Sequence, residues 1–322
     1  MRTYLRESEY ETKMKEMVEP ALAAVRQPGT FRTADGTELY FALYPASAPR
    51  GSVVIVHGFS ETAEKYRELI WYFLQENYTV LAYDQRGHGR STRIAPADVT
   101  HVTDFSDYVE DLHALVVAKG GELPGPRYLF SHSMGGAVGA LFLIMYPGFF
   151  GKAVLSSPMI AARHDGLGLH ACRGICLFCM KTGRAAKRIF VSGKASDPSG
   201  ETPEASASDS AARFEYYRQL RMAAPVLFCG APTYNWTYAS LGVTKRILAK
   251  GAPERVKIPV LLFSADNDTL VKRKPQQEFI RRVAHGTFVT EPAKHEIYAA
   301  GDAVLYPYLD RIFRFFEEEG LA

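Results

Sequence analysis

The chain has 322 residues, of which 47% are hydrophobic, enough for a large packed core. Its 38 basic and 35 acidic side chains give a formal net charge of +3, which argues against nucleic acid as the main partner. The sequence has neither the apolar run of a secretory signal peptide nor a run approaching the roughly 20 residues that span a bilayer, so we expect a soluble, cytoplasmic protein.

Strand-like and helix-like segments alternate along the first half of the chain. Runs rich in β-branched and aromatic residues predict strands at 38–44, 52–58, 78–84, 127–132 and 152–157. Helical periodicity predicts helices at 65–77, 104–119 and 133–146, the second with Asp104 as its N-cap. This alternation predicts a mostly parallel sheet with helices on both faces.

The alternation stops between Met159 and Arg255. This stretch holds helical pieces and a tract at 192–212 that is rich in Ser, Ala, Pro and charge, which predicts a mobile loop. The alternation resumes with a strand at 259–265, a helix at 274–284, a strand at 286–292 and an amphipathic helix at 302–318. We therefore expect one α/β core, formed by 1–158 and 256–322, that carries an inserted, mainly helical cap at 159–255.

Three of the four cysteines, Cys172, Cys176 and Cys179, have a C-x3-C-x2-C spacing. Such a spacing can hold an iron–sulfur cluster through thiolates. The same positions fall on one face of an apolar helix, where cysteine is commonly a small buried hydrophobe. We interpret them as buried side chains and expect neither a metal nor an organic cofactor.

The motif Ser-His-Ser-Met-Gly follows a predicted strand and opens a predicted helix. A nucleophile at such a sharp turn needs small residues two positions before and two positions after it. Around Ser133 these are Ser131 and Gly135, whereas Ser131 would have Leu129 on one side. We predict Ser133 as the nucleophile and expect the backbone N–H of Met134 to bind the oxyanion.

A general base and its acid partner are expected later in the chain, in the order Asp or Glu, then His. Only His285 and His295 follow the predicted strand at 259–265. His285 precedes the next strand, whereas His295 follows it, at the carboxyl end where open α/β sheets form their sites. We predict His295 as the base. Asp266 and Asp268 both remain candidates for the acid.

Five segments resemble, in chain order, the monoacylglycerol lipase and lysophospholipase group of serine α/β-hydrolases: VIVHGFSETAEKY, AYDQRGHGRSTR, SHSMGGA, SADNDTLV and KHEIY. Two more, HVTDFSDYVEDL and APTYNWTYAS, resemble bacterial lysophospholipase L2 more specifically. The resemblance implies the α/β-hydrolase fold and Phe59 as the second oxyanion donor. It also favours Asp268 over Asp266, because the family's acid loop reads Gly-x-x-Asp-x-x-Val, which Ala265, Asp268 and Val271 fit.

The resemblance implies a serine carboxylic-ester hydrolase that cleaves a single-chain acyl ester, a lysophospholipid or monoacylglycerol, through an acyl-enzyme on Ser133. The alternatives on the same scaffold are a short-chain esterase, a thioesterase, a proline-type aminopeptidase and, in another class, a non-catalytic binding protein. We expect a small lipid-like ester as the partner and no nucleic acid. Peripheral contact with the inner membrane face through the cap stays open, as does the oligomeric state.

Overall fold

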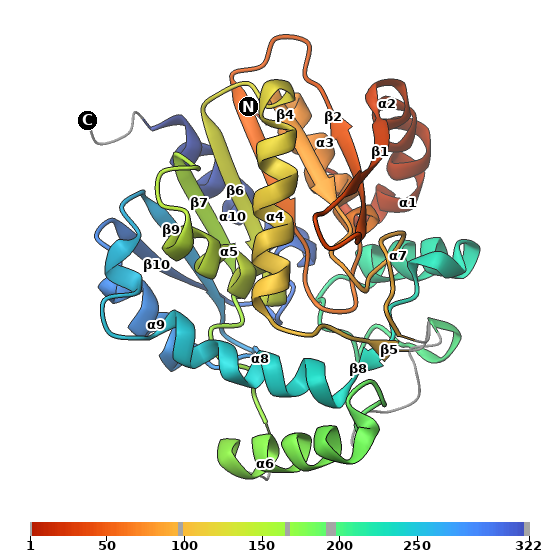
Figure 1. The fold of residues 1–322 in the computed structure, drawn as a ribbon. Helices are drawn as coiled ribbons and strands as arrows, with labels where there is room; N and C mark the ends of the chain where they lie inside the picture. Colours follow the sequence, from red (N-terminus) through yellow and green to blue (C-terminus); the bar gives the residue numbers. More distant parts are fainter. Residues whose placement is uncertain (1, 96–98, 165–167, 191–197, 319–322) are drawn as a thin grey trace.

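The computed structural model describes residues 2–95, 99–164, 168–190 and 198–318. Within these residues an eight-stranded sheet runs in the order β1 (Gln27–Arg32), β2 (Glu38–Tyr44), β4 (Tyr78–Tyr83), β3 (Gly51–Val56), β6 (Arg127–His132), β7 (Lys152–Ser156), β9 (Val260–Ala265) and β10 (Gly286–Glu291) (Figure 1). Neighbouring strands from β4 to β10 are parallel. β2 is antiparallel to both β4 and β1 at one edge. The predicted mostly parallel sheet is confirmed, and β1 is a strand that the sequence analysis missed.

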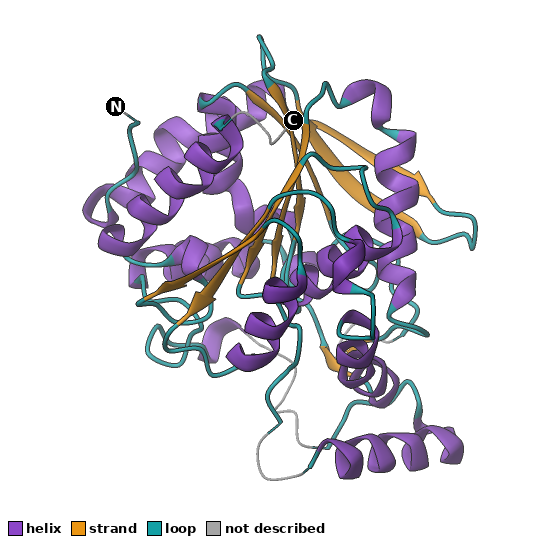
Figure 2. Ribbon diagram, turned by 90° about the vertical axis from the view of Figure 1, so that its left-hand side faces the viewer, coloured by secondary structure: helices purple, strands orange, loops and turns teal. Residues whose placement is uncertain are grey.

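Helices lie on both faces of the sheet, as Figure 2 shows with the sheet seen nearly edge-on. One face packs against α4 (Ser106–Ala118), α5 (Ser133–Met145), α8 (Tyr234–Ile247) and α9 (Arg273–Arg282). The other packs against α1 (Tyr10–Lys13), α2 (Glu19–Val25), α3 (Arg67–Gln75) and α10 (Asp302–Glu317). In β3, Val54 and Val56 join the first core, and Val53 and Ile55 join the second. Period-two alternation between two apolar faces explains why this strand is buried along its whole length.

One local prediction was wrong, and another is tested only in part. The helix expected from Asp104 begins at Ser106, with Phe105 at its N-cap, and Asp104 instead accepts a hydrogen bond from the Ser106 N–H in the preceding turn (2.7 Å). Part of the polar tract, 192–197, lies outside the described residues. The described remainder before α7 (Ala211–Ala223) is mostly loop and turn, as expected, but Ser208 and Ser210 are buried and the Ser210 side chain caps α7.

The segment 159–255 contains α6 (Leu169–Cys179), α7 and α8. α8 packs into the core beside α5, and α6 lies beyond α8, farthest from the sheet (Figure 1). Cys176 and Cys179 are buried in a small cluster with Tyr234, as expected, whereas Cys172 is partly exposed. Among the described residues, no helix is long and apolar enough to cross a bilayer. Nor does this part of the chain bring together three His, Cys, Asp or Glu side chains that could hold a metal ion.

Candidate active site

Ser133 stands at the sharp turn between β6 and α5. Its φ of +53° lies in the left-handed region, which non-glycine residues seldom adopt and which is typical of strained functional turns. A Cβ on Gly135 would lie 2.3 Å from the Val56 carbonyl oxygen, so this position requires glycine. Ser131 is buried in β6, and Gly139 of α5 leaves room for its hydroxyl: a Cβ there would lie 2.7 Å from Ser131 Oγ. Ser131 therefore fits at this turn because Gly139 of α5, which faces its hydroxyl, has no side chain. The motif alone does not reveal this compensating glycine.

Three predicted site residues from distant parts of the chain form one hydrogen-bonded row. His295 Nε2 lies 2.7 Å from Ser133 Oγ, and His295 Nδ1 lies 2.6 Å from Asp268 Oδ2. His295 and Asp268 are buried, whereas Ser133 is partly exposed. Asp266 lies outside the row and pairs with Arg273 at 2.7 Å. The structure thus brings Ser133, His295 and Asp268 together in the order that proton transfer from a serine requires.

The Asp268 carboxylate is held by more than the histidine. Its Oδ1 accepts hydrogen bonds from the backbone N–H groups of Leu270 (2.8 Å) and Val271 (3.0 Å). Burial favours the neutral acid, but the hydrogen bond and charge of His295 and these two N–H groups outweigh it and lower the pKa of Asp268. An ionised Asp268 keeps the proton of His295 on Nδ1, which leaves the Nε2 lone pair facing Ser133 Oγ.

The Phe59 N–H belongs to a peptide whose orientation is fixed from the other side. His57 Nδ1 lies 2.7 Å from the Gly58 carbonyl oxygen. His57 Nε2 accepts the Gln85 N–H (2.9 Å), so the ring proton is on Nδ1 and donates to Gly58. Because a trans peptide points C=O and N–H in opposite directions, the Phe59 N–H faces away from His57. Among the residues that the structure describes, none accepts a hydrogen bond from it. Met134 is the second residue of α5, so its backbone N–H likewise has no acceptor within the helix.

Glu61 is a site residue that sequence reasoning missed. Its buried carboxylate accepts hydrogen bonds from the Gly58 N–H (2.7 Å), Tyr66 (2.6 Å), Tyr298 (2.7 Å) and Lys65 (2.9 Å). Burial opposes its charge, but the neighbouring cation of Lys65 and these hydrogen bonds keep the pKa of Glu61 well below its usual value. Glu61 thus anchors the loop that carries Phe59. No signal in the sequence marks Glu61, because its burial and its partners, which a buried acid requires, come from the fold.

The model of the serine aminopeptidase, S33, family matches residues 47–299 of the chain. The chain belongs to this family. Lysophospholipase L2 of Escherichia coli is 31% identical over 307 residues, which cover 90% of this chain and 87% of that protein. The monoacylglycerol lipase of Mycolicibacterium smegmatis is 28% identical over 265 residues, 82% of this chain and 86% of that protein.

Solved structures support the same fold. A soluble variant of monoglyceride lipase from Saccharomyces cerevisiae, solved with a substrate analogue, superposes with a TM-score of 0.68 over 91% of this chain and 96% of that one, at 18% identity. At this identity the likeness shows the fold alone. It confirms the α/β-hydrolase fold that the sequence motifs implied.

Proposed function

We propose that the protein is a serine carboxylic-ester hydrolase whose nucleophile is Ser133. His295 takes the proton from Ser133 Oγ as the oxygen attacks the ester carbonyl, and Asp268 stabilises the imidazolium that forms. The N–H groups of Phe59 and Met134 bind the oxyanion of the tetrahedral intermediate. The intermediate collapses to an acyl-enzyme with loss of the alcohol, which takes the proton from His295. Water activated by His295 then releases the fatty acid.

One observation carries this proposal: the continuous hydrogen-bonded row from Ser133 Oγ through His295 to Asp268, at 2.7 and 2.6 Å, beside a strained turn. Two relatives, a lysophospholipase L2 and a monoacylglycerol lipase, support a single-chain acyl ester, that is, a lysophospholipid or monoacylglycerol, as the substrate. We assign 1–158 and 256–322 to the catalytic core and 159–255 to a cap over it, because α7 contributes to the cavity beside the catalytic loops.

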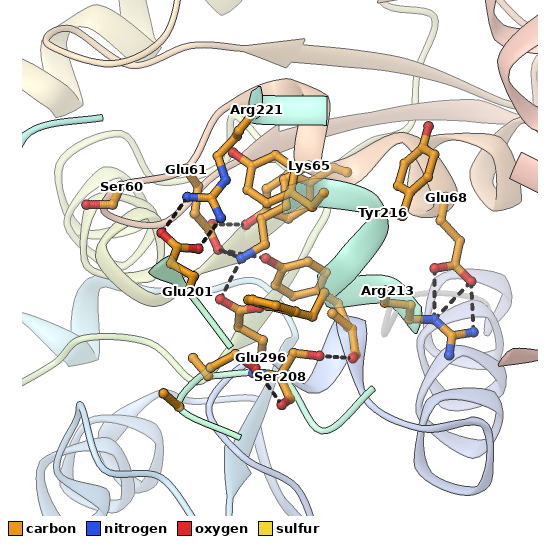
Figure 3. A pocket seen from close by; sticks show the side chains of 18 of the residues that line it. Ser60, Glu61, Lys65, Glu68, Glu201, Ser208, Arg213, Tyr216, Arg221 and Glu296 are labelled. Carbon is orange, nitrogen blue, oxygen red and sulfur yellow. Dashed lines mark hydrogen bonds and ion pairs between the residues drawn. The ribbon is translucent and has the colours of Figure 1, made fainter. Parts of the chain in front are cut away.

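An aminopeptidase is the alternative that the family's description favours. Such an enzyme needs a free carboxylate near the nucleophile to bind the substrate's α-ammonium group. Four glutamates line the cavity beside the catalytic loops, and each pairs with a cation: Glu61 and Glu296 with Lys65, Glu68 with Arg213, and Glu201 with Arg221 (Figure 3). Because each of these carboxylates already has a cationic partner, a substrate that brings only an ammonium group would displace that cation and leave it unpaired, so an ester substrate fits the site better.

The test combines active-site labelling with a substrate panel. We expect a fluorophosphonate probe to label Ser133, and we expect hydrolysis of p-nitrophenyl esters to favour long acyl chains over acetate. Ser133→Ala should lose both labelling and hydrolysis. Full esterase activity in Ser133→Ala would contradict the mechanism. Faster hydrolysis of a proline p-nitroanilide than of any ester would favour the aminopeptidase.

We further propose that α6 and the turn after it contact an anionic membrane surface, at the inner face if the protein is cytoplasmic. Three exposed apolar side chains, Leu177, Phe178 and Phe190, accompany four exposed basic ones, Lys181, Arg184, Lys187 and Arg188. Residues 168–190 include no Asp or Glu. Basic residues beside exposed apolar ones, in the segment that includes and directly follows the helix farthest from the sheet, complement anionic lipid headgroups (Figure 1).

Co-sedimentation with vesicles tests this contact. The protein should bind vesicles rich in phosphatidylglycerol more strongly than vesicles of phosphatidylcholine alone, and salt should weaken the binding. The double variant Lys187→Glu/Arg188→Glu should lose most of this binding, since each basic residue contributes about 1 kcal/mol. The same charge change at Lys250 and Lys257, which are exposed elsewhere, should have little effect. Equal losses in both double variants would contradict a specific role for this surface.

A further inference from the structure

A cavity of about 740 Å³ adjoins the loops that carry the proposed catalytic groups. Phe59 and Ser60 line it from the oxyanion loop, Leu270 from the loop of Asp268, and Glu296 from the position after His295. Its volume lies within the roughly 300–1,000 Å³ of small-molecule sites. The cavity therefore lies beside the row of Ser133, His295 and Asp268 rather than around it, in a position to receive one end of the substrate.

The part of the cavity near these loops has a charged wall, which we define as Lys65, Glu201, Arg221 and Glu296 (Figure 3). Lys65 Nζ lies 2.5 Å from a Glu296 oxygen, and Arg221 forms a two-pronged pair with Glu201, one prong at 2.9 Å. The four side chains are between 10% and 28% exposed, so a ligand can reach charges that little water screens.

An aromatic ring holds the two cations of this wall. The Arg221 guanidinium lies 5.0 Å from the centroid of the Tyr217 ring, and Lys65 Nζ lies 5.2 Å from the same centroid. Tyr217 and Arg221 come from α7, whereas Lys65 comes from the turn that precedes α3. Contact with one ring orders both side chains in advance, which reduces the side-chain entropy that is lost when they bind an anionic group.

The balance of charge decides which ligand fits. Among the described residues, the charged side chains that line the cavity are three cations, Lys65, Arg213 and Arg221, and four carboxylates, Glu61, Glu68, Glu201 and Glu296. A purely anionic ligand would draw the cations from their partners and leave buried carboxylates uncompensated, which is costly. A ligand with both a phosphate and an ammonium group instead offers a new partner to each side of an ion pair.

We propose that the charged wall binds the zwitterionic headgroup of a lysophospholipid, a phosphodiester that carries an amine. Arg221 and Lys65 bind the phosphate, for which the planar guanidinium is well suited, and Glu201 and Glu296 bind the amine. This inference rests on the proposed function and deepens it, because it assigns the leaving alcohol to the cavity and makes a residue of the cap a determinant of specificity.

The experiment compares three substrates with the same acyl chain: lysophosphatidylethanolamine, lysophosphatidic acid and monoacylglycerol. For the unmodified protein we expect the highest kcat/KM with lysophosphatidylethanolamine. Arg221→Gln should lower the ratio of its kcat/KM to that of monoacylglycerol about tenfold, through KM, because a charge-assisted contact is lost. Glu201→Gln should shift the preference toward lysophosphatidic acid, because it removes a negative charge that repels the phosphate and attracts the amine.

Arg218→Gln is the matched control. Arg218 lies on the same helix and pairs with Glu215, but it does not line the cavity, so this variant should keep all three ratios. sn-Glycero-3-phosphoethanolamine should inhibit hydrolysis of a p-nitrophenyl ester competitively, and inorganic phosphate should not, which separates a headgroup subsite from a simple anion site.

Two results would overturn the inference: equal losses with all three substrates in both cavity variants, or a preference of the unmodified protein for monoacylglycerol. The Glu201→Gln arm keeps the test decisive if Arg221→Gln proves unstable by thermal unfolding. Failure of the fluorophosphonate probe to label Ser133 refutes the proposed function itself. A labelled enzyme with no headgroup preference refutes only this inference.

Discussion

At the scale of single residues, two neighbouring aspartates have different partners, and we expect only one of them to affect the reaction. Asp268 accepts a hydrogen bond from the Nδ1–H of His295, whereas the exposed Asp266 pairs with Arg273. Asp268→Asn should lower kcat by roughly 10⁴, because an amide donor at that position favours the wrong tautomer of His295. Asp266→Asn has the same change of charge and should keep kcat close to that of the unmodified enzyme. Steady-state kinetics on a soluble ester distinguish them, and a near-normal Asp268→Asn enzyme would reject Asp268 as the acid.

The sequence supports some of these residue assignments better than others. Ser133 follows from the size of its neighbours, and His295 follows from chain order and its place after a strand, because both are local arguments. The choice between Asp266 and Asp268 needed a family pattern, since each follows the same strand within three residues. Gly139 and Glu61 were missed, because their importance depends on which side chain faces them across the fold.

At the scale of elements, the contact between α5 and β3 fixes the position of Ser133. A Cβ on Gly135 would lie 2.3 Å from the Val56 oxygen and 2.4 Å from the His57 oxygen, both of them backbone atoms that cannot move aside cheaply. We expect Gly135→Ala to lower the midpoint of thermal unfolding by several degrees and to weaken fluorophosphonate labelling, because α5 must shift away from the end of β3 and the loop that carries Phe59.

Gly174→Ala is the control for this prediction. Gly174 lies in α6, and an added Cβ there would meet nothing within 4 Å. The substitution should raise helix stability by up to about 1 kcal/mol, because alanine favours helix more than glycine does. If both variants unfolded at the same temperature, the close approach of α5 to β3 would not be a constraint.

At the scale of the whole molecule, hydrophobic patterning predicted the fold. It did not predict the elements whose structure depends on tertiary contacts. The buried strands and long helices could be recognised in the sequence because each needs an apolar run. β1 did not, since it is an exposed edge strand that contains Pro28 and Gly29 and is held by its pairing with β2. The polar composition of 192–212 likewise hid Ser208 and Ser210, which the fold buries through hydrogen bonds to the backbone and side chains around them.

The charged wall shows the same limit more sharply. Lys65, Glu201, Arg221 and Glu296 come from four separate segments, and no spacing in the sequence relates them. Each alone is typical of a solvated surface charge. Only the fold reveals that they share a cavity, so the sequence could predict the reaction while leaving the polar end of the substrate open.

Acid sensitivity is a property of the whole fold. His88 and His132 are fully buried, and burial lowers the pKa of each to about 3. In the unfolded chain histidine titrates near pH 6.5, so below that pH the unfolded state binds protons that the folded state does not, and stability falls as pH decreases. Each histidine should contribute about 1.4 kcal/mol per pH unit between roughly pH 6.5 and pH 5. Urea unfolding at pH 8, 6 and 5 measures this fall, which should be smaller in His88→Phe. A free energy of unfolding that stayed level between pH 7 and pH 5 would contradict neutral, buried histidines.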